Sequence, residues 1–405
     1  MSHPTPARVP TLTTPIILLM SAATGLIVAS NYYAQPLLHT ISQQFGLNET
    51  AAGSIVMTAQ LSYAAGLMLL VPLGDMLERR ALIVFMTLLS AVGLLISGFA
   101  NSFPMLLAGT AATGVLSVVA QVLVPFAATL AAPHQRGKAV GTVMSGLLLG
   151  ILLARTVAGG LAELGSWRTV YWVASGLLLI MAAALSRVLP RYKATTHLSY
   201  TSLLASIFHL YAREPLFRAR SLLGALIFAS FSMFWTPLTF LLANPPYSYS
   251  DSTIGLFGLA GAAGAFAANR FGRLNDRGRG NLATRIGLIL LAASWVLLAL
   301  GAHSLAALLI GVVMLDMMIQ GVHVTNQTSI YRLQPDARSR LTAGYMTSYF
   351  IGGAAGSLIS SFLYAAGGWL AVSAGGLAVS LAALAYAAWS PSARIPENPP
   401  PAPRG

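Results

Sequence analysis

The 405-residue chain contains no cysteine and few charged residues. Without cysteine it can form no disulfide, no thiolate metal site and no thiol nucleophile. Charged residues make up 8% of the sequence, whereas soluble domains contain about 25%. So few charges cannot cover a water-facing surface, and most of the exterior must therefore face lipid.

Hydrophobic residues make up 56% of the chain and gather in long apolar runs. A helix needs about 20 apolar residues to cross a membrane, and its backbone must be hydrogen-bonded within the segment. The sequence therefore predicts an all-α membrane protein with twelve transmembrane helices and no soluble domain. The predicted helices are residues 15–38, 52–74, 81–100, 104–131, 139–162, 168–189, 221–243, 253–271, 283–302, 304–330, 341–365 and 369–389.

The distribution of basic residues predicts the orientation of these helices. The net charge is +13, which in a soluble protein would indicate nucleic acid binding. Here the basic residues, except Arg155 and Arg168, fall in the tails and in alternate loops. By the positive-inside rule, we expect a multi-pass protein of the bacterial inner membrane with both termini in the cytoplasm. The expected partner is therefore the lipid bilayer and not nucleic acid.

Residues in the two halves of the chain match at a nearly constant separation. Such a repeat is typical of transporters whose halves are related by an axis along the membrane normal, with a binding site near the midplane. We expect two pseudo-symmetric six-helix bundles at 1–189 and 221–390, a cytoplasmic linker at 190–220 and a proline-rich cytoplasmic tail at 391–405. The matched pairs are Asp75 with Asp276, Pro36 with Pro237, Gly53 with Gly255, Pro133 with Pro335, Arg136 with Arg338, Gly150 with Gly352, and Trp167 with Trp369.

Two further patterns concern how these parts pack. Residues 200–211 of the linker are amphipathic, which fits either a helix on the membrane surface or a solvated connection. Small residues recur every four positions in the fifth and eleventh predicted helices. This spacing allows close backbone approach, and we expect it to form the sliding contact between the halves. The residues are Gly146, Gly150, Ala154 and Ala158, and Ser348, Gly352, Gly356 and Ser360.

A short motif that joins a carboxylate to arginines follows the second predicted helix and recurs after the eighth. The first copy is Leu73-Gly74-Asp75-Met76-Leu77-Glu78-Arg79-Arg80, and the second is Gly272-Arg273-Leu274-Asn275-Asp276-Arg277-Gly278-Arg279. Both resemble the cytoplasmic signature of the major facilitator superfamily, and the similarity covers essentially the whole chain. The resemblance implies a transporter of small molecules with a cytoplasmic gate motif at Asp75, Arg79, Arg80, Asp276 and Arg277. The alternative is a simple cytoplasmic anchor.

Within that superfamily the chain resembles the bacterial drug:proton antiporters. The residues that carry this resemblance are the turn Pro133-His134-Gln135-Arg136-Gly137-Lys138 and the glycine-rich fifth helix that follows it. Where those proteins have a glycine-proline pair, this chain has Ala154-Arg155. The resemblance implies efflux of a drug or metabolite coupled to protons, by a protein that functions as a monomer.

Asp316 is the acidic residue that lies farthest from any predicted membrane surface. An ionisable residue at the bilayer centre costs about 2.5–3.5 kcal/mol on insertion scales, so it marks a functional site by default. The residues Gln320, His323 and Gln327 follow on the same face of the tenth predicted helix. We predict that Asp316 and His323 carry proton coupling and that the two glutamines line the substrate cavity. The alternative is a buried polar network that only fixes helix packing.

Polar and aromatic residues in three other helices are predicted to line the same cavity. Those of the first and seventh helices precede Pro36 and Pro237, which indicates kinked or discontinuous helices with ligand-contacting ends. Interfacial anchoring is the alternative role for the aromatic ones. The predicted cavity residues are Asn31, Tyr32 and Gln35 in the first helix, Thr113, Ser117 and Gln121 in the fourth, and Trp235 in the seventh.

Arg155, in the fifth predicted helix, is the second charge within the membrane. Three roles are open for it: to neutralise Asp316, to bind an anionic substrate, or to replace the antiporter proline as a gate element. We therefore include Arg155 among the predicted cavity residues.

The function predicted from these features is secondary active transport by alternating access, coupled to protons and directed outwards. One alternative is a proton-coupled uptake symporter for a small metabolite, anionic if Arg155 binds it. Another is a membrane sensor that transports nothing, since fold does not imply function. The sequence contains no P-loop, metal-ligand cluster or nucleophile–base pair. We therefore expect no enzymatic activity, no cofactor and no metal.

Overall fold

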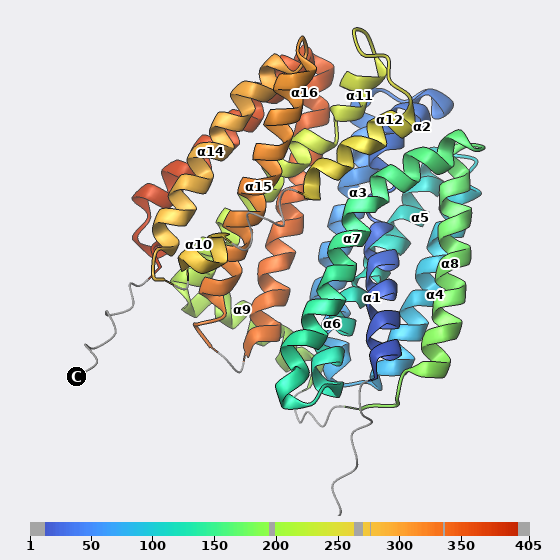
Figure 1. Cartoon of the computed structure of the whole chain (residues 1–405), viewed down its shortest axis with the longest axis vertical. Coiled ribbons are helices and arrows are strands. Elements are labelled where there is room, and N and C mark those ends of the chain that lie inside the picture. The colour runs from blue at the N-terminus through green and yellow to red at the C-terminus, as the bar shows by residue number, and fades with distance from the viewer. Residues whose placement is uncertain (1–12, 194–198, 263–269, 276, 335–336, 396–405) are drawn as a thin grey trace, which may run out of the picture.

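The chain folds into two bundles of long helices. The structure is a computed structural model of the whole chain, and it describes residues 13–193, 199–262, 270–275, 277–334 and 337–395. Figure 1 shows the helices α1 to α8 in one bundle and the helices α10 to α16 in the other. No β-strand occurs in these ranges, and the predicted all-α fold is confirmed.

The N-terminal bundle contains helices that are interrupted at several points by short 3-10 turns. Its elements are α1 (Thr14–Ala29), η1 (Gln35–Leu37), α2 (Leu38–Phe45), α3 (Glu49–Leu69), η2 (Val71–Asp75), α4 (Arg79–Gly98), α5 (Phe103–Leu116), η3 (Ser117–Val119), α6 (Ala120–Leu130), η4 (Pro133–Gln135), α7 (Arg136–Glu163) and α8 (Trp167–Val188).

The C-terminal bundle follows the linker helix α9 (Tyr200–Arg213). Its elements are α10 (Pro215–Trp235), α11 (Leu238–Ala243), α12 (Asp251–Leu256), η5 (Phe257–Gly261), α14 (Gly280–Leu300), α15 (Leu305–Ile330), α16 (Arg338–Trp389) and η7 (Pro391–Ala393). The long helix α16 is two helices joined by a sharp turn at Gly367 and Gly368. Gly368 has φ 64°, a conformation that only glycine adopts without strain. The helix α10 begins at Pro215, inside the range predicted as the linker.

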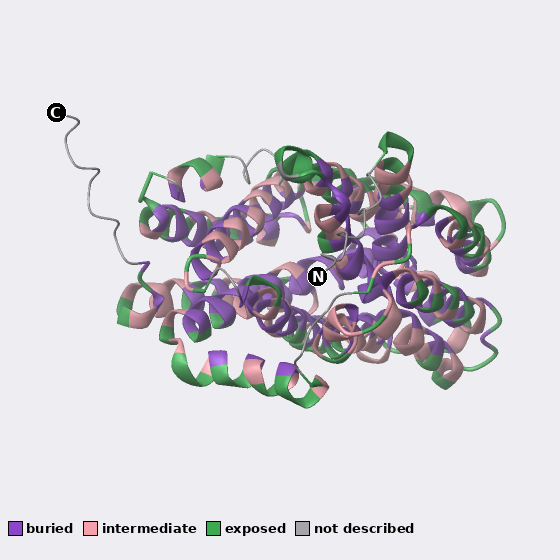
Figure 2. Cartoon of the chain, turned by 90° about the horizontal axis from the view of Figure 1, so that it is seen from below, coloured by how far each residue is buried: buried purple, intermediate pink, exposed green. Residues whose placement is uncertain are grey.

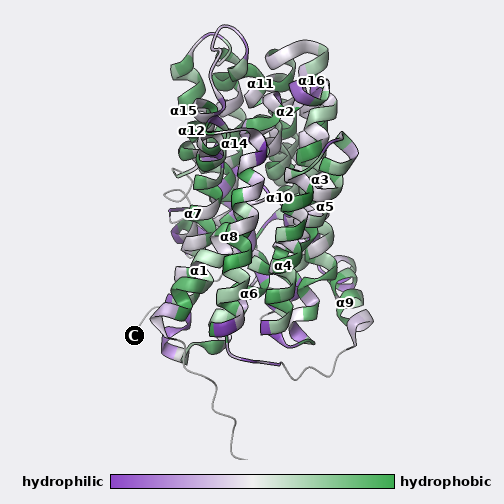
Figure 3. Cartoon of the chain, turned by 90° about the vertical axis from the view of Figure 1, so that its right-hand side faces the viewer, coloured by the Kyte–Doolittle hydropathy of each residue, from purple (hydrophilic) through white to green (hydrophobic). Residues whose placement is uncertain are grey.

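The described helices account for a multi-pass membrane protein. Nine of them are long and apolar enough to span a membrane, and one of the nine is α16, which its turn divides in two. The shorter apolar helix α1 continues through η1 into α2, and α12 with η5 leads to residues 263–269, which lie outside the described ranges. These segments together are consistent with twelve crossings. Figure 3 shows apolar residues along the length of the bundles.

Each bundle repeats one close helix contact, and this corrects the role predicted for the small residues. A Cβ atom added at Gly150 would lie 2.2 Å from the carbonyl oxygen of Gly25 in α1, and one added at Gly352 would lie 2.1 Å from that of Ala225 in α10. Gly146 and Gly356 make the same kind of contact with α1 and α10. These glycines therefore pack helices within a bundle. The prediction that they form the sliding contact between halves was wrong.

The two bundles meet near one end of the molecule. We call the end at which Arg79, Arg187 and Arg338 lie the basic end. Figure 1 shows the bundles joined around α2, α11 and α12 at the opposite end, and diverging towards α6 and α9 at the basic end. Five hydrogen bonds between the bundles lie towards the opposite end: Thr40 with Asp251, Thr156 with Gly255, Thr239 with Pro36, Ser252 with Glu163 and Ser357 with Gly53. Viewed from the basic end, buried residues line the inner sides of both bundles (Figure 2).

Candidate functional site

Two broken helices, one from each bundle, face each other at the contact between the bundles. The helix α1 ends at Ala29 and its path resumes at η1, while α10 ends at Trp235 and its path resumes at α11. The hydroxyl group of Thr239 donates to the carbonyl oxygen of Pro36 at 3.1 Å. The breaks predicted from Pro36 and Pro237 are therefore present, and they bring their flanking side chains to the interface between bundles.

Arg155 reaches this interface from α7 and is 3% exposed. Its Nε donates to Oε1 of Gln35 at 2.7 Å. Three aromatic rings lie against its guanidinium group, with centroids 4.1 Å away for Trp235, 4.9 Å for Tyr32 and 5.6 Å for Phe231. Ring faces stabilise a desolvated cation by up to about 2 kcal/mol. Residues of both bundles thus hold this charge inside the protein.

Asp316 contacts the same tryptophan through its indole N–H group. It is 4% exposed in the middle of α15, and its Oδ1 accepts a hydrogen bond from Nε1 of Trp235 at 3.2 Å. The hydrogen-bonding partner of each intramembrane charge is thus a neutral side chain, and one indole contacts both. Arg155 belongs to the N-terminal bundle and Asp316 to the C-terminal bundle, so the site spans both.

Three glycines allow the eighth membrane segment to pass directly beside these charges. A Cβ atom added at Gly255 would lie 2.5 Å from the carbonyl oxygen of Arg155, and one at Gly258 would lie 2.9 Å from Cβ of Arg155. One added at Gly261 would lie 3.3 Å from Oδ2 of Asp316. The sequence analysis did not identify this set, although its regular spacing of three residues was a signal for it.

Two hydrogen-bond donors in the site are left without acceptors. Nη2 of Arg155 and Nε2 of Gln35 are both buried and have no hydrogen-bond partner among the described residues. Because the two side chains already contact each other through Nε and Oε1, their free donors belong to one local cluster. A ligand with an acceptor group, above all a carboxylate, would satisfy them.

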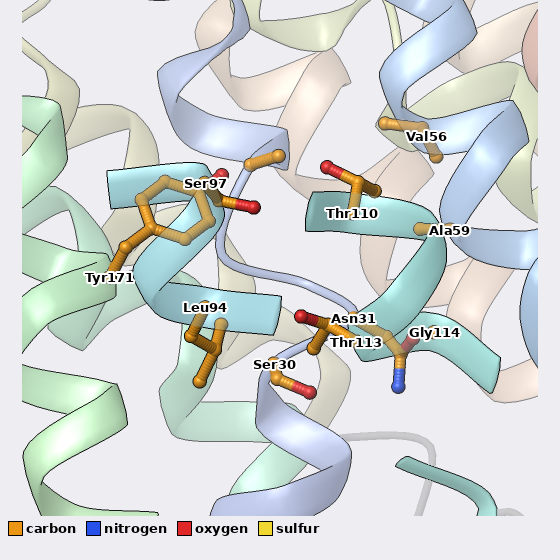
Figure 4. A pocket seen from close by; sticks show the side chains of 11 residues that line it. Ser30, Asn31, Val56, Ala59, Leu94, Ser97, Thr110, Thr113, Gly114 and Tyr171 are labelled. Carbon is orange, nitrogen blue, oxygen red and sulfur yellow. The ribbon is translucent and has the colours of Figure 1, made fainter. Parts of the chain in front are cut away.

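A small polar cavity lies inside the N-terminal bundle, next to the break between α5 and α6 (Figure 4). Its volume is about 20 Å³, which is room for about one water molecule. Asn31 Oδ1, Ser97 Oγ and Thr113 Oγ1 line it and have no partner among the described residues, while Nδ2 of Asn31 donates to Ser117 at 2.8 Å. The cavity is too small for a substrate, and the predicted substrate contacts of Asn31, Thr113 and Ser117 stay predictions.

The remaining polar residues predicted on α15 face a different neighbour from Asp316. His323 contacts the hydroxyl group of Tyr345 at 3.0 Å, and Gln327 lies 3.7 Å from the sulfur of Met346, both on α16 of the same bundle. Gln320, one turn before His323 on α15, is half-buried. A role of these residues in proton coupling or substrate binding stays a prediction.

Gln121 of α6 makes a similarly local contact. Its Nε2 lies 3.4 Å from the hydroxyl group of Tyr63 in α3. The ring of Tyr63 in turn packs against Phe350 of the C-terminal bundle, with centroids 4.3 Å apart. Gln121 is thus linked to the contact between the bundles through the side chain of Tyr63.

Arg79 organises the predicted gate motif at the basic end. It forms an ion pair with Asp75 at 3.2 Å and donates to the carbonyl oxygen of Gly74 and to Thr129 of α6. Arg80 is half-buried beside it. These contacts join two helices of the N-terminal bundle. In the second copy Arg277 is exposed and Asp276 lies outside the described residues, and the gating role of both copies stays a prediction.

A second buried arginine, Arg220, was assigned to the linker by sequence. It lies in α10, is 1% exposed, and its Nη1 donates to Thr284 at 3.0 Å and to Asn326 at 3.1 Å. Its Nη2 donates to the carbonyl oxygen of Ala393. Arg220 thus fixes η7, near the end of the described chain, to the helices of the C-terminal bundle.

Comparison with known proteins identifies the family. The sequence pattern of the Major Facilitator Superfamily matches residues 20–333 and 271–405. The chain belongs to this superfamily. It is 60% identical over 366 residues to the putative uncharacterized transporter YgaY of Escherichia coli. This alignment covers 90% of this chain and 93% of that protein. It is 30% identical over 383 residues to a probable transporter of Streptomyces coelicolor, covering 94% and 87% of the two chains.

The fold of the superfamily is also found by structural similarity. A bacterial homologue of the human lysosomal transporter Spinster, in an inward-facing and unoccupied conformation, aligns with a TM-score of 0.72 at 16% identity. The alignment covers 93% of this chain and 94% of that one. The two-bundle fold and a role as a multi-pass membrane transporter of the Major Facilitator Superfamily are therefore established for this chain.

Proposed function

We propose that this transporter exports small organic molecules across the bacterial inner membrane in exchange for protons, and that Asp316 is the residue that binds the proton. The observation that carries the proposal is the sharing of Trp235 by Arg155 and Asp316 at the contact between the bundles. An ionisable residue inside a membrane protein is expensive and generally functional. Two of opposite charge, one from each bundle, form a unit that a change in access would rearrange.

Protonation of Asp316 supplies a physical basis for coupling. The ionised carboxylate offsets the charge of Arg155, and the protonated one does not, so the net charge at the interface changes by one unit. In a desolvated environment such a change favours one arrangement of the bundles over the other. Alternating access then follows if the proton and the substrate favour opposite arrangements.

The outward direction is supported by the resemblance to drug:proton antiporters, and the state of the structure is compatible with it. The bundles are joined at the end opposite to the basic end, which the positive-inside rule assigns to the cytoplasm. This arrangement is the one expected to accept an export substrate from the cytoplasm. The rings of Tyr32, Phe231 and Trp235 would suit an amphipathic substrate.

The test is transport in inside-out vesicles with a panel of amphipathic cations, sugars and carboxylates, with and without a pH gradient. We expect uphill uptake of at least one class into the vesicles, and we expect a protonophore to abolish it. Asp316→Asn should remove the dependence on the gradient while downhill exchange of the same compound persists. Glu49→Gln, a carboxyl change at the opposite end of the molecule, should leave coupling intact. Uphill transport that survives both Asp316→Asn and the protonophore would contradict the proposal.

A second function is favoured by the free donors of Arg155 and Gln35. A carboxylate bound there would balance the charge of Arg155 and favour a proton on Asp316, so that the anion and the proton would move together. This describes uptake by symport. The two functions differ in the direction of proton flux: in proteoliposomes, symport acidifies the compartment that receives the substrate, whereas antiport makes it more alkaline.

A further inference from the structure

A basic pocket lies between α9 and the start of α16, far from the site shared by Arg155 and Asp316. Its volume is about 340 Å³. On α9 it is lined by Ser202, Ser206, His209 and Arg213, which follow at intervals of four, three and four residues and so share one helix face. The opposite wall contains Gln334 and Arg340.

The described residues that line this pocket carry a net positive charge. Neither Arg213 nor Arg340 forms an ion pair within the described ranges. The ion pair found there joins Arg79 and Asp75. None of the described residues that line the pocket carries a carboxylate. The nearby carboxylate of Glu214 accepts a hydrogen bond from Gln334 at 2.9 Å. Two guanidinium groups, an imidazole and the hydroxyl group of Ser202 therefore indicate an anion with several acceptor oxygens; the hydroxyl group of Ser206 already donates to the carbonyl oxygen of Leu203.

The position of α9 indicates where that anion comes from. The helix buries Leu203, Ile207 and Leu210 against the bundles and leaves Phe208 59% exposed. Figures 1 and 3 place it at the basic end, beside the ends of the membrane helices. An amphipathic helix there lies at the level of lipid headgroups. Phe208 lies on a different face of α9 from the pocket, and its exposed ring is available to the hydrocarbon of the leaflet.

The helix α9 is also attached to both bundles. The hydroxyl group of Tyr200 donates to the carbonyl oxygen of Leu69 in α3 at 2.9 Å, and that of Tyr211 donates to the carbonyl oxygen of Gly344 in α16 at 2.8 Å. A ligand held between α9 and Arg340 would therefore strengthen the attachment of the linker to the C-terminal bundle.

We propose that this pocket binds the phosphate group of an anionic phospholipid in the cytoplasmic leaflet. The basic residues attract the anionic surface, and the arginine forks match phosphate oxygens. The site is independent of which substrate is transported and of how transport is coupled.

The test measures lipid binding to the full-length protein by native mass spectrometry, with phosphatidylglycerol against phosphatidylcholine. The wild type should retain phosphatidylglycerol preferentially. The variant Arg213→Gln with Arg340→Gln should bind it about 30-fold more weakly, which corresponds to about 1 kcal/mol for each basic residue. Arg187→Gln with Arg338→Gln removes the same charge from the basic end outside the pocket and should bind as the wild type does. Equal loss in both variants would show a non-specific charge effect and would overturn the proposal.

Two further arms identify the source of the phosphate and guard against misfolding. Inorganic phosphate at millimolar concentration should not displace the lipid. Displacement by phosphate would assign the pocket to a soluble anion instead. Arg213→Lys with Arg340→Lys keeps the charge and should restore most of the binding; failure of this folded variant to bind more lipid than the glutamine variant would also overturn the proposal.

Discussion

Two buried arginines in this transporter have opposite surroundings. Arg220 donates to Thr284, Asn326 and the carbonyl oxygen of Ala393, all within the C-terminal bundle, and its Nε has no partner in the described residues. Arg155 has one hydrogen bond, to Gln35, and its Nη2 has no partner in the described residues. A buried charge that is well hydrogen-bonded stabilises its surroundings, whereas one that is poorly bonded is retained at a cost in stability. We infer that Arg220 serves the fold and Arg155 serves transport.

The pair Arg155→Gln and Arg220→Gln tests this division. Arg220→Gln should lower the free energy of unfolding by about 2–4 kcal/mol, because it leaves several buried acceptors unsatisfied. Arg155→Gln should change it by less than about 1 kcal/mol, because the loss of ring contacts is offset by removal of a desolvated charge. Transport should fall at least roughly tenfold in Arg155→Gln. Thermal unfolding in detergent and vesicle transport measure the two effects, and a large stability loss in Arg155→Gln would contradict the assignment.

At the scale of single residues, the sequence predicted the two functional charges but not their shared contact with Trp235. Arg155 and Asp316 were predicted as functional residues because charges inside apolar helices are rare. That Trp235 contacts both of them depends on the rotation of three helices and on the rotamers of three side chains. No periodicity in a single helix contains that information. The buried position of Arg220 was missed for a related reason, since α10 extends beyond the apolar run that marked it.

Helices were predicted well wherever apolar runs end at capping residues. The side chains of Asn48, Ser102 and Ser304 accept hydrogen bonds from the first turns of α3, α5 and α15, and such residues favour helix starts. Breaks at Pro36 and Pro237 were predicted from proline chemistry. The break at η3 was not, because no proline or glycine in Ser117–Val119 marks it. The four-residue spacing of small residues also predicted which positions allow close helix packing. It did not predict which neighbouring helix each position contacts.

The glycines of α7 provide a matched test of that packing. Gly150 faces α1, where an added Cβ atom would lie 2.2 Å from the carbonyl oxygen of Gly25, whereas Gly160 has no atom within 4 Å of that position. Gly150→Ala should therefore destabilise the protein by about 1–3 kcal/mol, because a backbone atom cannot move away cheaply. Gly160→Ala should leave stability unchanged or raise it by up to about 1 kcal/mol through helix propensity. Similar melting temperatures for the two variants would show that α1 and α7 are not in this close contact.

For the whole molecule, the internal repeat and the contact between bundles have separate structural origins. The repeated glycine contacts of α7 with α1 and of α16 with α10 make each bundle rigid. The contact between bundles uses other residues, including Thr40 with Asp251 and Gly159 against the backbone of Asp251. Two rigid bodies joined near one end are suited to the rocking motion of alternating access. The bonds at that end must then break in each transport cycle.

A disulfide across that contact should therefore stop transport. The chain contains no cysteine, so an introduced pair of cysteines can form a disulfide only with each other within the chain. Thr40 and Asp251 are suitable positions because their side-chain oxygens lie 2.7 Å apart in different bundles. Oxidation of Thr40→Cys with Asp251→Cys should abolish transport, and a reducing agent should restore it.

The control is a pair within one bundle. Ser230 and Ser380 have Oγ atoms 3.3 Å apart in the C-terminal bundle, and a disulfide between cysteines at these positions joins two helices that move together. Oxidation of this variant should leave transport at the rate of its reduced form. If the pair at Thr40 and Asp251 were fully crosslinked and still transported substrate, the bundles would not need to separate at this end, and the rocking of two rigid bundles would have to be replaced by a movement of individual helices within them.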